Sequence, residues 1–138
     1  MSLNIEILET SFDLVKLKSD QVATSFYSYL FADYPEVKPL FANSDMTEQR
    51  KKLVNSLVVI VDVLRNPEEL SHTLRGLGTR HIKYGVTPEH YPMVGNSLLK
   101  AFESNLGSSW TPEVKQSWVD AYDAIADLML DGAKVEDV

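Results

Sequence analysis

A stripe of leucines that ends in a histidine constrains this chain more than any other feature. Three leucines recur at spacings of four and three residues, which is the period of one face of an α-helix, at Leu70, Leu74 and Leu77. The next position on that face is His81. The pattern therefore predicts a helix that carries one imidazole into an apolar core, where each ring nitrogen needs a partner.

A buried imidazole has two readings. In the commoner one it is a core residue that is bonded to a carbonyl oxygen. In the other it is a metal ligand, although most metal sites need several ligands at set spacings. Haem is an exception, since a single histidine can hold the iron from its proximal side. The choice depends on whether the rest of the chain supplies an apolar slot with polar groups facing the histidine.

Helical periodicity recurs along the whole chain, with Pro and Gly at the ends of the segments. We expect helices at about 5–15, 19–31, 47–64, 70–81, 88–106 and from 112 onward. Segment 57–64, LVVIVDVL, is rich in β-branched residues and would suit a strand, but the helical stripe that runs into it favours a helix. The sequence predicts an all-α domain of about seven to eight helices.

Turn and cap residues support these boundaries. Ser19-Asp20 suits the start of the second helix, residues 43–45 precede the third, and Thr111-Pro112 opens the last. A short bend is expected at Pro39–Phe41. Gly85 can take the left-handed conformation that ends a helix.

Composition limits the functions that are open to the chain. A length of 138 residues fits one domain, 1–138, that can bury a core and a cofactor. The absence of Cys excludes disulfides, iron–sulfur clusters and thioether-linked haem. A net charge of −7 argues against nucleic acid and anionic membrane surfaces as partners. Neither a signal peptide nor a membrane span is visible, so a cytoplasmic protein is expected.

Four motifs in order give the chain a family resemblance: FYSYLFADYPEVKPLF at 26–41, EQRKKL at 48–53, LGTRHIKYGV at 77–86 and HYPMVG at 90–95. Over nearly its full length the chain resembles the globins, most closely the bacterial flavohaemoglobin and single-domain haemoglobin branch. The resemblance implies a globin fold that encloses haem b, an iron protoporphyrin IX.

The resemblance also implies roles for particular residues. His81 matches the proximal iron ligand, and Phe41 matches the phenylalanine that packs on the porphyrin. Tyr27 and Gln49 match the tyrosine and glutamine that face the bound gas, with Leu53 over the iron. An inward Tyr or Gln is more often a packing residue, but here two such side chains, both able to donate hydrogen bonds, lie on two otherwise apolar helix faces.

Further residues complete the expected haem pocket. Tyr91 matches the proximal tyrosine of the HYP motif, and Tyr122 the tyrosine of the last helix. The remaining lining residues are expected to be Leu57, Leu77, Val94 and Leu98. Arg80 and Lys83 flank the histidine and suit the haem propionates, although solvated charges are an equal alternative.

Five other side chains receive weaker roles. Lys52 would reach the iron only after a shift of its helix. His72 and His90 are expected to be exposed or capping residues, and Trp110 and Trp118 packing or surface residues.

Two departures from the flavohaemoglobin pattern stand out. Ala133 occupies the position of a glutamate that joins the proximal histidine and tyrosine in a hydrogen-bonded group, while Asp131 and Glu136 lie at other offsets. The chain also ends at Val138, without the flavin- and nicotinamide-binding domains of those enzymes. A separate reductase would then have to reduce the iron.

Three functions follow as expectations. The first is a haem protein that binds O₂, CO and NO reversibly and serves as an oxygen carrier or store. The second is a nitric oxide dioxygenase that depends on a separate reductase and converts NO and O₂ to nitrate. The third is a haem-based gas sensor; a haem-free helical interaction module is a further alternative.

Overall fold

Over the described residues the regular secondary structure is helical, which confirms the predicted all-α class. A computed structural model describes residues 4–83 and 85–136, and in it the side chains of 82–83 and 133–136 are not described. Over the described residues there are no strands, and the elements are α1 (Ile5–Leu17), α2 (Ser19–Asp33), η1 (Pro35–Phe41), α3 (Met46–Asp62), α4 (Pro67–Lys83), α5 (His90–Leu106), η2 (Gly107–Ser109) and α6 (Pro112–Glu136). The β-branched segment from residue 57 thus continues helix α3.

Side-chain caps define several of the helix starts. The Asn4 side chain accepts a hydrogen bond from the Ile7 N–H at α1, and Asp45 accepts one from Thr47 at α3. The Thr111 hydroxyl accepts one from Val114 at α6. Each cap satisfies a donor that a helix start leaves without an intrahelical partner.

The predicted Ser19-Asp20 cap is wrong. Helix α2 begins at Ser19 directly after Lys18, and no side chain caps it. Since α1 ends one residue earlier, the Lys18 carbonyl itself accepts the first helical bond of α2, from the Val22 N–H. The chain turns between two helices without a loop that could hold a capping side chain.

Other boundaries also differ from the prediction, and α4 begins at Pro67 rather than at residue 70. A 3-10 helix covers the whole of Pro35–Phe41, where only a bend at its end was expected; Val37 is buried and anchors it. Helix α5 begins at His90 rather than at Pro88, because i→i−3 bonds form a turn over residues 87–91. Gly85 has a φ of +88° just after α4, as its predicted role in ending that helix requires.

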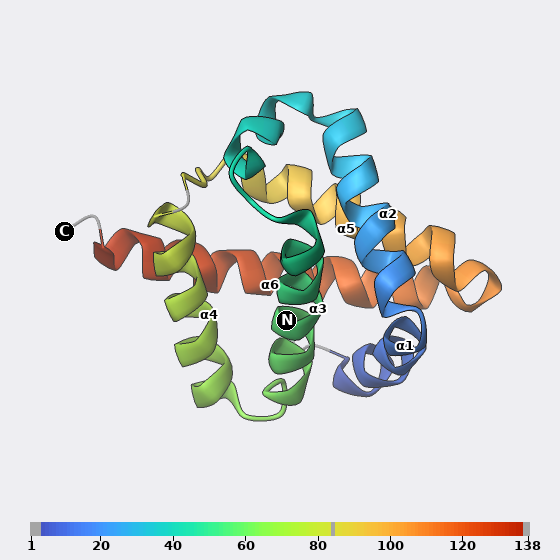
Figure 1. Cartoon of the computed structure of the whole chain (residues 1–138). Coiled ribbons are helices and arrows are strands. Elements are labelled where there is room, and N and C mark those ends of the chain that lie inside the picture. The colour runs from blue at the N-terminus through green and yellow to red at the C-terminus, as the bar shows by residue number, and fades with distance from the viewer. Residues whose placement is uncertain (1–3, 84, 137–138) are drawn as a thin grey trace.

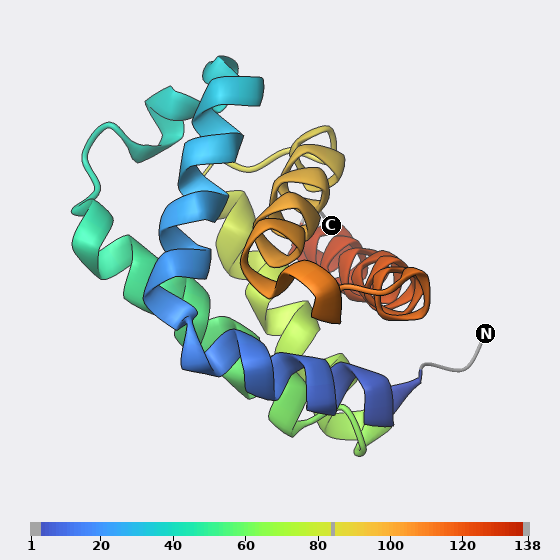
Figure 2. The ribbon, with the colours of Figure 1, turned by 90° about the vertical axis from the view of Figure 1, so that its right-hand side faces the viewer.

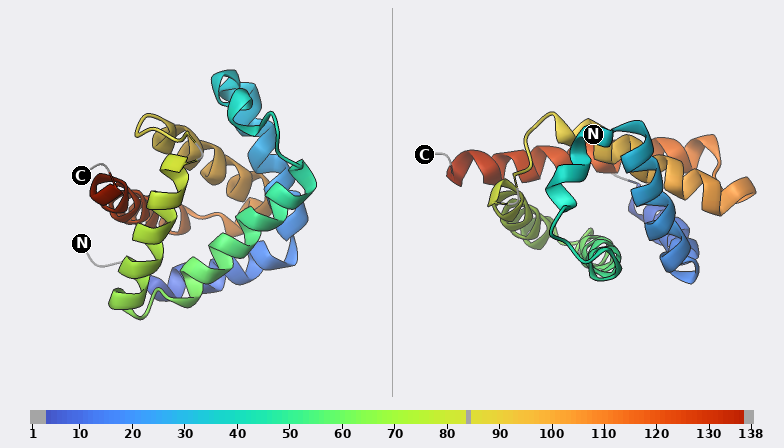
Figure 3. Two further views of the ribbon diagram at one scale, coloured as in Figure 1. Left: turned by 60° about the vertical axis from the view of Figure 1, so that its left-hand side comes forward. Right: turned by 45° about the horizontal axis from the view of Figure 1, so that its top comes forward.

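The helices cross one another around a shared core. In Figure 1, α3 and α4 run side by side across the long helix α6, and Figure 3 shows both of them on the same side of α6. Figure 2 shows α5 beside α6, with α2 packed on α5. The most extensive packing between two helices joins α4 to α6. No helix within the described residues is both long and apolar enough to cross a membrane.

Candidate functional site

His81 lies on α4, on the face that its leucines turn toward the core. Leu70 and Leu74 are buried there, while Leu77 and His81 itself are half-buried. The His81 Nδ1 lies 2.7 Å from the Leu77 carbonyl oxygen, one helical turn earlier. Because a carbonyl oxygen can only accept, Nδ1 carries the proton and the lone pair lies on Nε2. A metal-ligating histidine is held in the same way, with its other ring nitrogen donating to a backbone carbonyl.

The surroundings of His81 favour a neutral ring. Burial lowers the pKa of His81, and the positive charge of Arg80 acts in the same direction. The hydrogen bond to the Leu77 carbonyl acts in the opposite direction and raises the pKa. A neutral imidazole is the form that binds a metal ion. Among the described residues no three His, Asp or Glu side chains gather as a multi-ligand metal site would require.

An aromatic cluster surrounds the phenol of Tyr27 on α2. Tyr27 is buried, and its ring centroid lies 5.6 Å from that of Phe41 on η1 and 5.9 Å from that of Phe31. Phe31 and Phe41 themselves pack edge to face at 5.4 Å. Such pairs are favourable ring geometries, so the cluster fixes the orientation of the phenol.

Gln49 on α3 meets this phenol. Burial raises the pKa of Tyr27, and a hydrogen bond from the Gln49 side chain and the charge of Arg50 oppose that effect. The structure thus brings Tyr27 and Gln49 together from two helices. The phenol keeps its proton at neutral pH and can donate a hydrogen bond.

Several large apolar side chains are only partly covered by protein. They pack against the buried core but remain half-buried, and they come from η1, α3, α4, α5 and α6: Phe41, Leu53, Leu57, Leu77, Val94 and Tyr122. By contrast, Leu98 and Tyr91 are buried. Partly uncovered apolar surface on so many elements fits a large apolar cofactor that would complete its burial. Together with the His81 tautomer, this set fits haem.

The α3 residues differ in depth of burial. The sequence places Gln49, Leu53 and Leu57 in the pocket, and they are half-buried. Ile60 and Val61 near the C-terminal end of α3 are buried, as is Leu64 just beyond it. The buried residues of α3 thus lie near its C-terminal end.

Tyr122 and Tyr91 link α6 to α5. The Tyr122 hydroxyl donates a hydrogen bond of 2.7 Å to the Tyr91 carbonyl oxygen. The Tyr122 ring lies against Gly95, where an added Cβ would come within 2.6 Å of the ring. Burial raises the pKa of both phenols, most strongly that of Tyr122. The two tyrosines thus set the position of the first turns of α5.

The weaker candidates divide between exposed and packing positions. Lys52, His72 and Arg80 are exposed, and the Arg80 guanidinium folds back toward Gly76. The Nδ1 of His90 accepts a hydrogen bond of 3.0 Å from the Thr87 N–H in the turn before α5, and no side chain caps α5 itself.

The two tryptophans take part in packing, as predicted. Trp118 is buried, and Trp110 packs on the ring of Phe102. Asp131 is exposed on α6. The side chains of Lys83, Ala133 and Glu136 lie outside the described residues.

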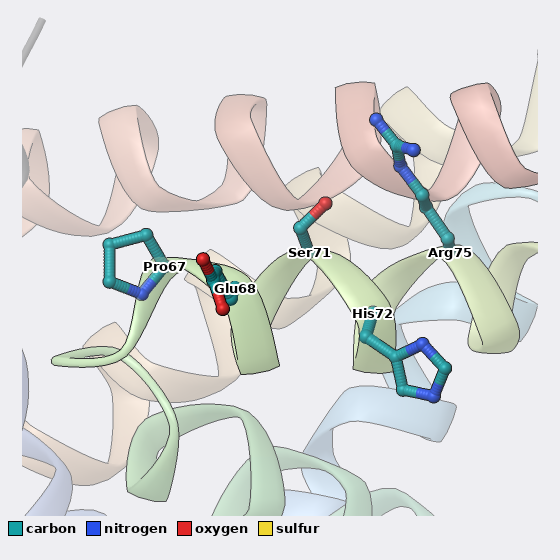
Figure 4. A pocket seen from close by; sticks show the side chains of 5 residues that line it. All are labelled: Pro67, Glu68, Ser71, His72 and Arg75. Carbon is teal, nitrogen blue, oxygen red and sulfur yellow. The ribbon is translucent and has the colours of Figure 1, made fainter.

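Two surface hollows lie along α4, away from its leucine stripe. One has a volume of about 430 Å³ and is lined by Pro67, Glu68, Ser71, His72 and Arg75. Figure 4 shows Ser71 and Arg75 pointing toward α6, and His72 pointing away from it. The other, of about 520 Å³, continues past Thr79 and Arg80 to Gly132 of α6. Neither is lined by any residue of the stripe that ends at His81, so we assign no ligand to them.

Sequence reasoning missed two parts of the site. It gave Phe31 no role, although its ring completes the cluster around Tyr27. It also gave His81 no named partner, and the i−4 carbonyl of Leu77 fills that place. The Leu77 carbonyl could have been predicted as this partner, because a helical side chain points back over the preceding turn.

Comparison with known proteins settles the family. The family model for globins matches residues 24–129. The chain belongs to the globin family. This globin is 30% identical to a flavohemoprotein of Bacillus subtilis, across 91% of this chain and 32% of the relative, so it spans about a third of that protein's length.

Solved structures agree. A bacterial globin of Campylobacter jejuni is 30% identical with a TM-score of 0.83, and the match covers 94% of each chain. An engineered carbene transferase, made from a nitric oxide dioxygenase candidate of Rhodothermus marinus, is 29% identical with the same TM-score, over 95% of this globin and 92% of that chain. The globin fold is confirmed, and family and fold together support a haem protein that binds gaseous ligands.

Proposed function

We propose that this globin binds O₂ reversibly, with CO and NO as further ligands, at a haem b iron held by His81, and that it serves as an oxygen carrier or store. His81 presents the Nε2 lone pair, because its Nδ1–H is engaged by the Leu77 carbonyl. When bound, haem supplies an iron with one coordination position open to diatomic gases.

The protein's contribution on the gas side comes from two side chains. The Tyr27 O–H and the Gln49 amide both donate hydrogen bonds, and they meet in a setting of aromatic rings that limits water. A ligand that takes up negative charge is stabilised by such donors, and a hydrogen bond to a charged acceptor contributes about 1.5–3 kcal/mol. The meeting of Tyr27 with Gln49 is the observation that carries the proposal.

Phe41, Leu53, Leu57, Leu77 and Val94 would cover the porphyrin. Their partial burial supports this role. Tyr91 and Tyr122 hold the start of α5, and exposed Arg80 is available to a haem propionate.

Absorption spectra test the first step. Protein expressed with ample haem should show a Soret band, which shifts on reduction under CO. The band should be lost in His81→Ala and kept in His72→Ala, a matched change at an exposed histidine of the same helix. Circular dichroism should show that both variants remain helical. A Soret band of full intensity in His81→Ala would contradict the assignment.

Nitric oxide dioxygenase activity with a separate reductase is the second candidate function. Its support is the likeness to flavohemoproteins and to the Rhodothermus protein, together with the Tyr27–Gln49 pair, which would orient O₂ for attack on NO. NO consumption should be measured under O₂, with and without an added flavin reductase and NADH. Sustained, multiple-turnover formation of nitrate only with the reductase would favour the enzyme, and a single stoichiometric turnover would favour the carrier.

A further inference from the structure

Helices α4 and α6 meet backbone to backbone at two glycines. A Cβ added to Gly78 would overlap the carbonyl of Met129, and one added to Gly132 would overlap the carbonyl of Arg75. Any larger residue at either position would push the helices apart. The two glycines therefore permit the close approach of the most extensively packed pair of helices in the fold.

The hydroxyl of Thr79 joins the two backbones at this contact. Its Oγ1 lies 3.1 Å from the Arg75 carbonyl oxygen on its own helix and 3.1 Å from the Gly132 carbonyl oxygen on α6. The single hydroxyl hydrogen is shared between two acceptors on different helices. Thr79 is half-buried, so water competes only partly for these bonds.

This contact lies inside the segment that holds the imidazole. Gly78 and Thr79 stand between Leu77, whose carbonyl accepts the hydrogen bond from the ring, and His81, which donates it. Both ends of that bond thus belong to a stretch of α4 that is fixed on α6. Helix α6 is tied to the rest of the molecule by Trp118, which donates to Ser11, and by Tyr122, which donates to Tyr91.

We propose that Thr79 is a positioning residue for the proximal ligand. Together with the Gly78 and Gly132 contacts, its hydroxyl holds segment 77–81 of α4 on α6, so that the His81 ring keeps one tilt and one distance from the cofactor. The inference rests on the proposed function, because it assumes that His81 holds haem iron. The proposed role of α6 is to hold the backbone of α4, and this role does not depend on a side chain of α6 that touches the His81 ring.

The test compares Thr79→Val with Thr79→Ser in the haem-loaded protein. Val keeps the shape of Thr and lacks the hydroxyl, whereas Ser keeps the hydroxyl. In the reduced, ligand-free state, the iron–histidine stretching band in the resonance Raman spectrum should broaden and move to lower frequency in Thr79→Val. It should match the wild type in Thr79→Ser. The rate of CO dissociation should change by about 2- to 10-fold in the Val variant, the range expected for one hydrogen bond.

Thr10→Val is the matched control. The Thr10 hydroxyl makes the same i−4 bond, to the Glu6 carbonyl, within α1. Its Raman band should equal that of the wild type. An unchanged band in Thr79→Val, even with a lower melting temperature, would overturn the proposal, and so would a band in Thr79→Ser that equals the one in Thr79→Val.

Amide hydrogen exchange of the apoprotein gives a readout that needs no haem. The amides of residues 77–81 should exchange faster in Thr79→Val than in the wild type and Thr79→Ser, and equal exchange would overturn the proposal. If the wild type takes up no haem, the proposed function fails. Slower amide exchange at residues 77–81 in the wild type than in Thr79→Val would still show that the hydroxyl links α4 to α6. If Thr79→Val does not fold, Thr79→Ala takes its place in the exchange experiment with the same expectation.

Discussion

The Tyr122 hydroxyl donates a 2.7 Å hydrogen bond to the Tyr91 carbonyl oxygen, and this bond ties the middle of α6 to the first turn of α5. Gly95, one turn further along α5, leaves room for the Tyr122 ring. One side chain therefore fixes both the distance between the helices and their register. The same contact buries a phenol that can titrate, which gives it a measurable signature in alkaline solution.

Tyr122→Phe should change stability differently at neutral and at alkaline pH. At pH 7 the variant loses one hydrogen bond, and its free energy of unfolding should fall by about 0.5–1.5 kcal/mol. Burial raises the pKa of Tyr122 in the folded state, whereas the unfolded chain releases the proton near the ordinary value of 10.0. The neutral phenol is therefore fully stabilising below about pH 10, and the stability is lost as the pH rises further.

Urea unfolding of the apoprotein between pH 7 and 11 measures this effect. The wild type also contains Tyr27 and Tyr91, whose pKa values are raised by burial, so its stability should decline above pH 10. The decline should be shallower in Tyr122→Phe, since one proton fewer is retained on folding. Parallel curves for the two proteins would exclude the buried Tyr122 phenol as a source of alkaline unfolding.

Ser11→Ala should destabilise the fold more than an ordinary serine deletion. The Trp118 indole N–H donates to the buried Ser11 hydroxyl over 2.9 Å, and that hydroxyl donates in turn to the Ile7 carbonyl. Removal of the hydroxyl leaves a buried N–H without its acceptor, at a cost of about 1–3 kcal/mol. Ser97→Ala is the control, because Ser97 is also buried and, among the described residues, its hydroxyl bonds to the Met93 carbonyl of its own helix. If urea unfolding gave equal losses in the free energy of unfolding for the two variants, the bond between Trp118 and Ser11 would make no stabilising contribution of its own.

The helices and their inward faces could be predicted because they depend on local spacing. The stripe of leucines that ends at His81 and the caps at Asp45 and Thr111 involve residues within one or two turns of each other. Depth of burial could not be predicted in the same way. Periodicity assigns Leu53 and Ile60 to the same face of α3, but only the crossing of the helices decides that Ile60 is buried and Leu53 half-buried.

The α4–α6 contact shows the same limit more sharply. Thr79 and Gly132 are 53 residues apart, and neither carries a local signal that it faces the other. A glycine inside a helix usually lowers helix stability, so helix propensity gives no reason for Gly78 and Gly132 in α4 and α6. Their use becomes visible only when the two backbones are placed side by side.

Tyr27→Phe should raise the rate of O₂ dissociation. The variant keeps the ring contacts with Phe31 and Phe41 and loses only the donor. Loss of a hydrogen bond to a charged acceptor predicts an increase of roughly 10- to 150-fold. Tyr29→Phe, at a half-exposed tyrosine of the same helix, should leave the rate as it is. Stopped-flow displacement of O₂ by CO measures both, and an unchanged rate in Tyr27→Phe would remove this residue from the ligand-binding role.

Gln49→Leu should raise the same rate by a smaller factor, and its effect should depend on Tyr27. The Gln49 side chain lies close enough to the Tyr27 phenol to oppose the rise of its pKa, and we expect it both to donate in the pocket and to orient the stronger donor. In Tyr27→Phe that second contribution is already lost, and adding Gln49→Leu should therefore cost less than it does in the wild type. Groups in one hydrogen-bonded network show coupling energies of about 0.5–3 kcal/mol in such a cycle. Additive effects on O₂ dissociation would mean that the two side chains act separately, and the pairing of α2 with α3 would then have no part in holding the gas.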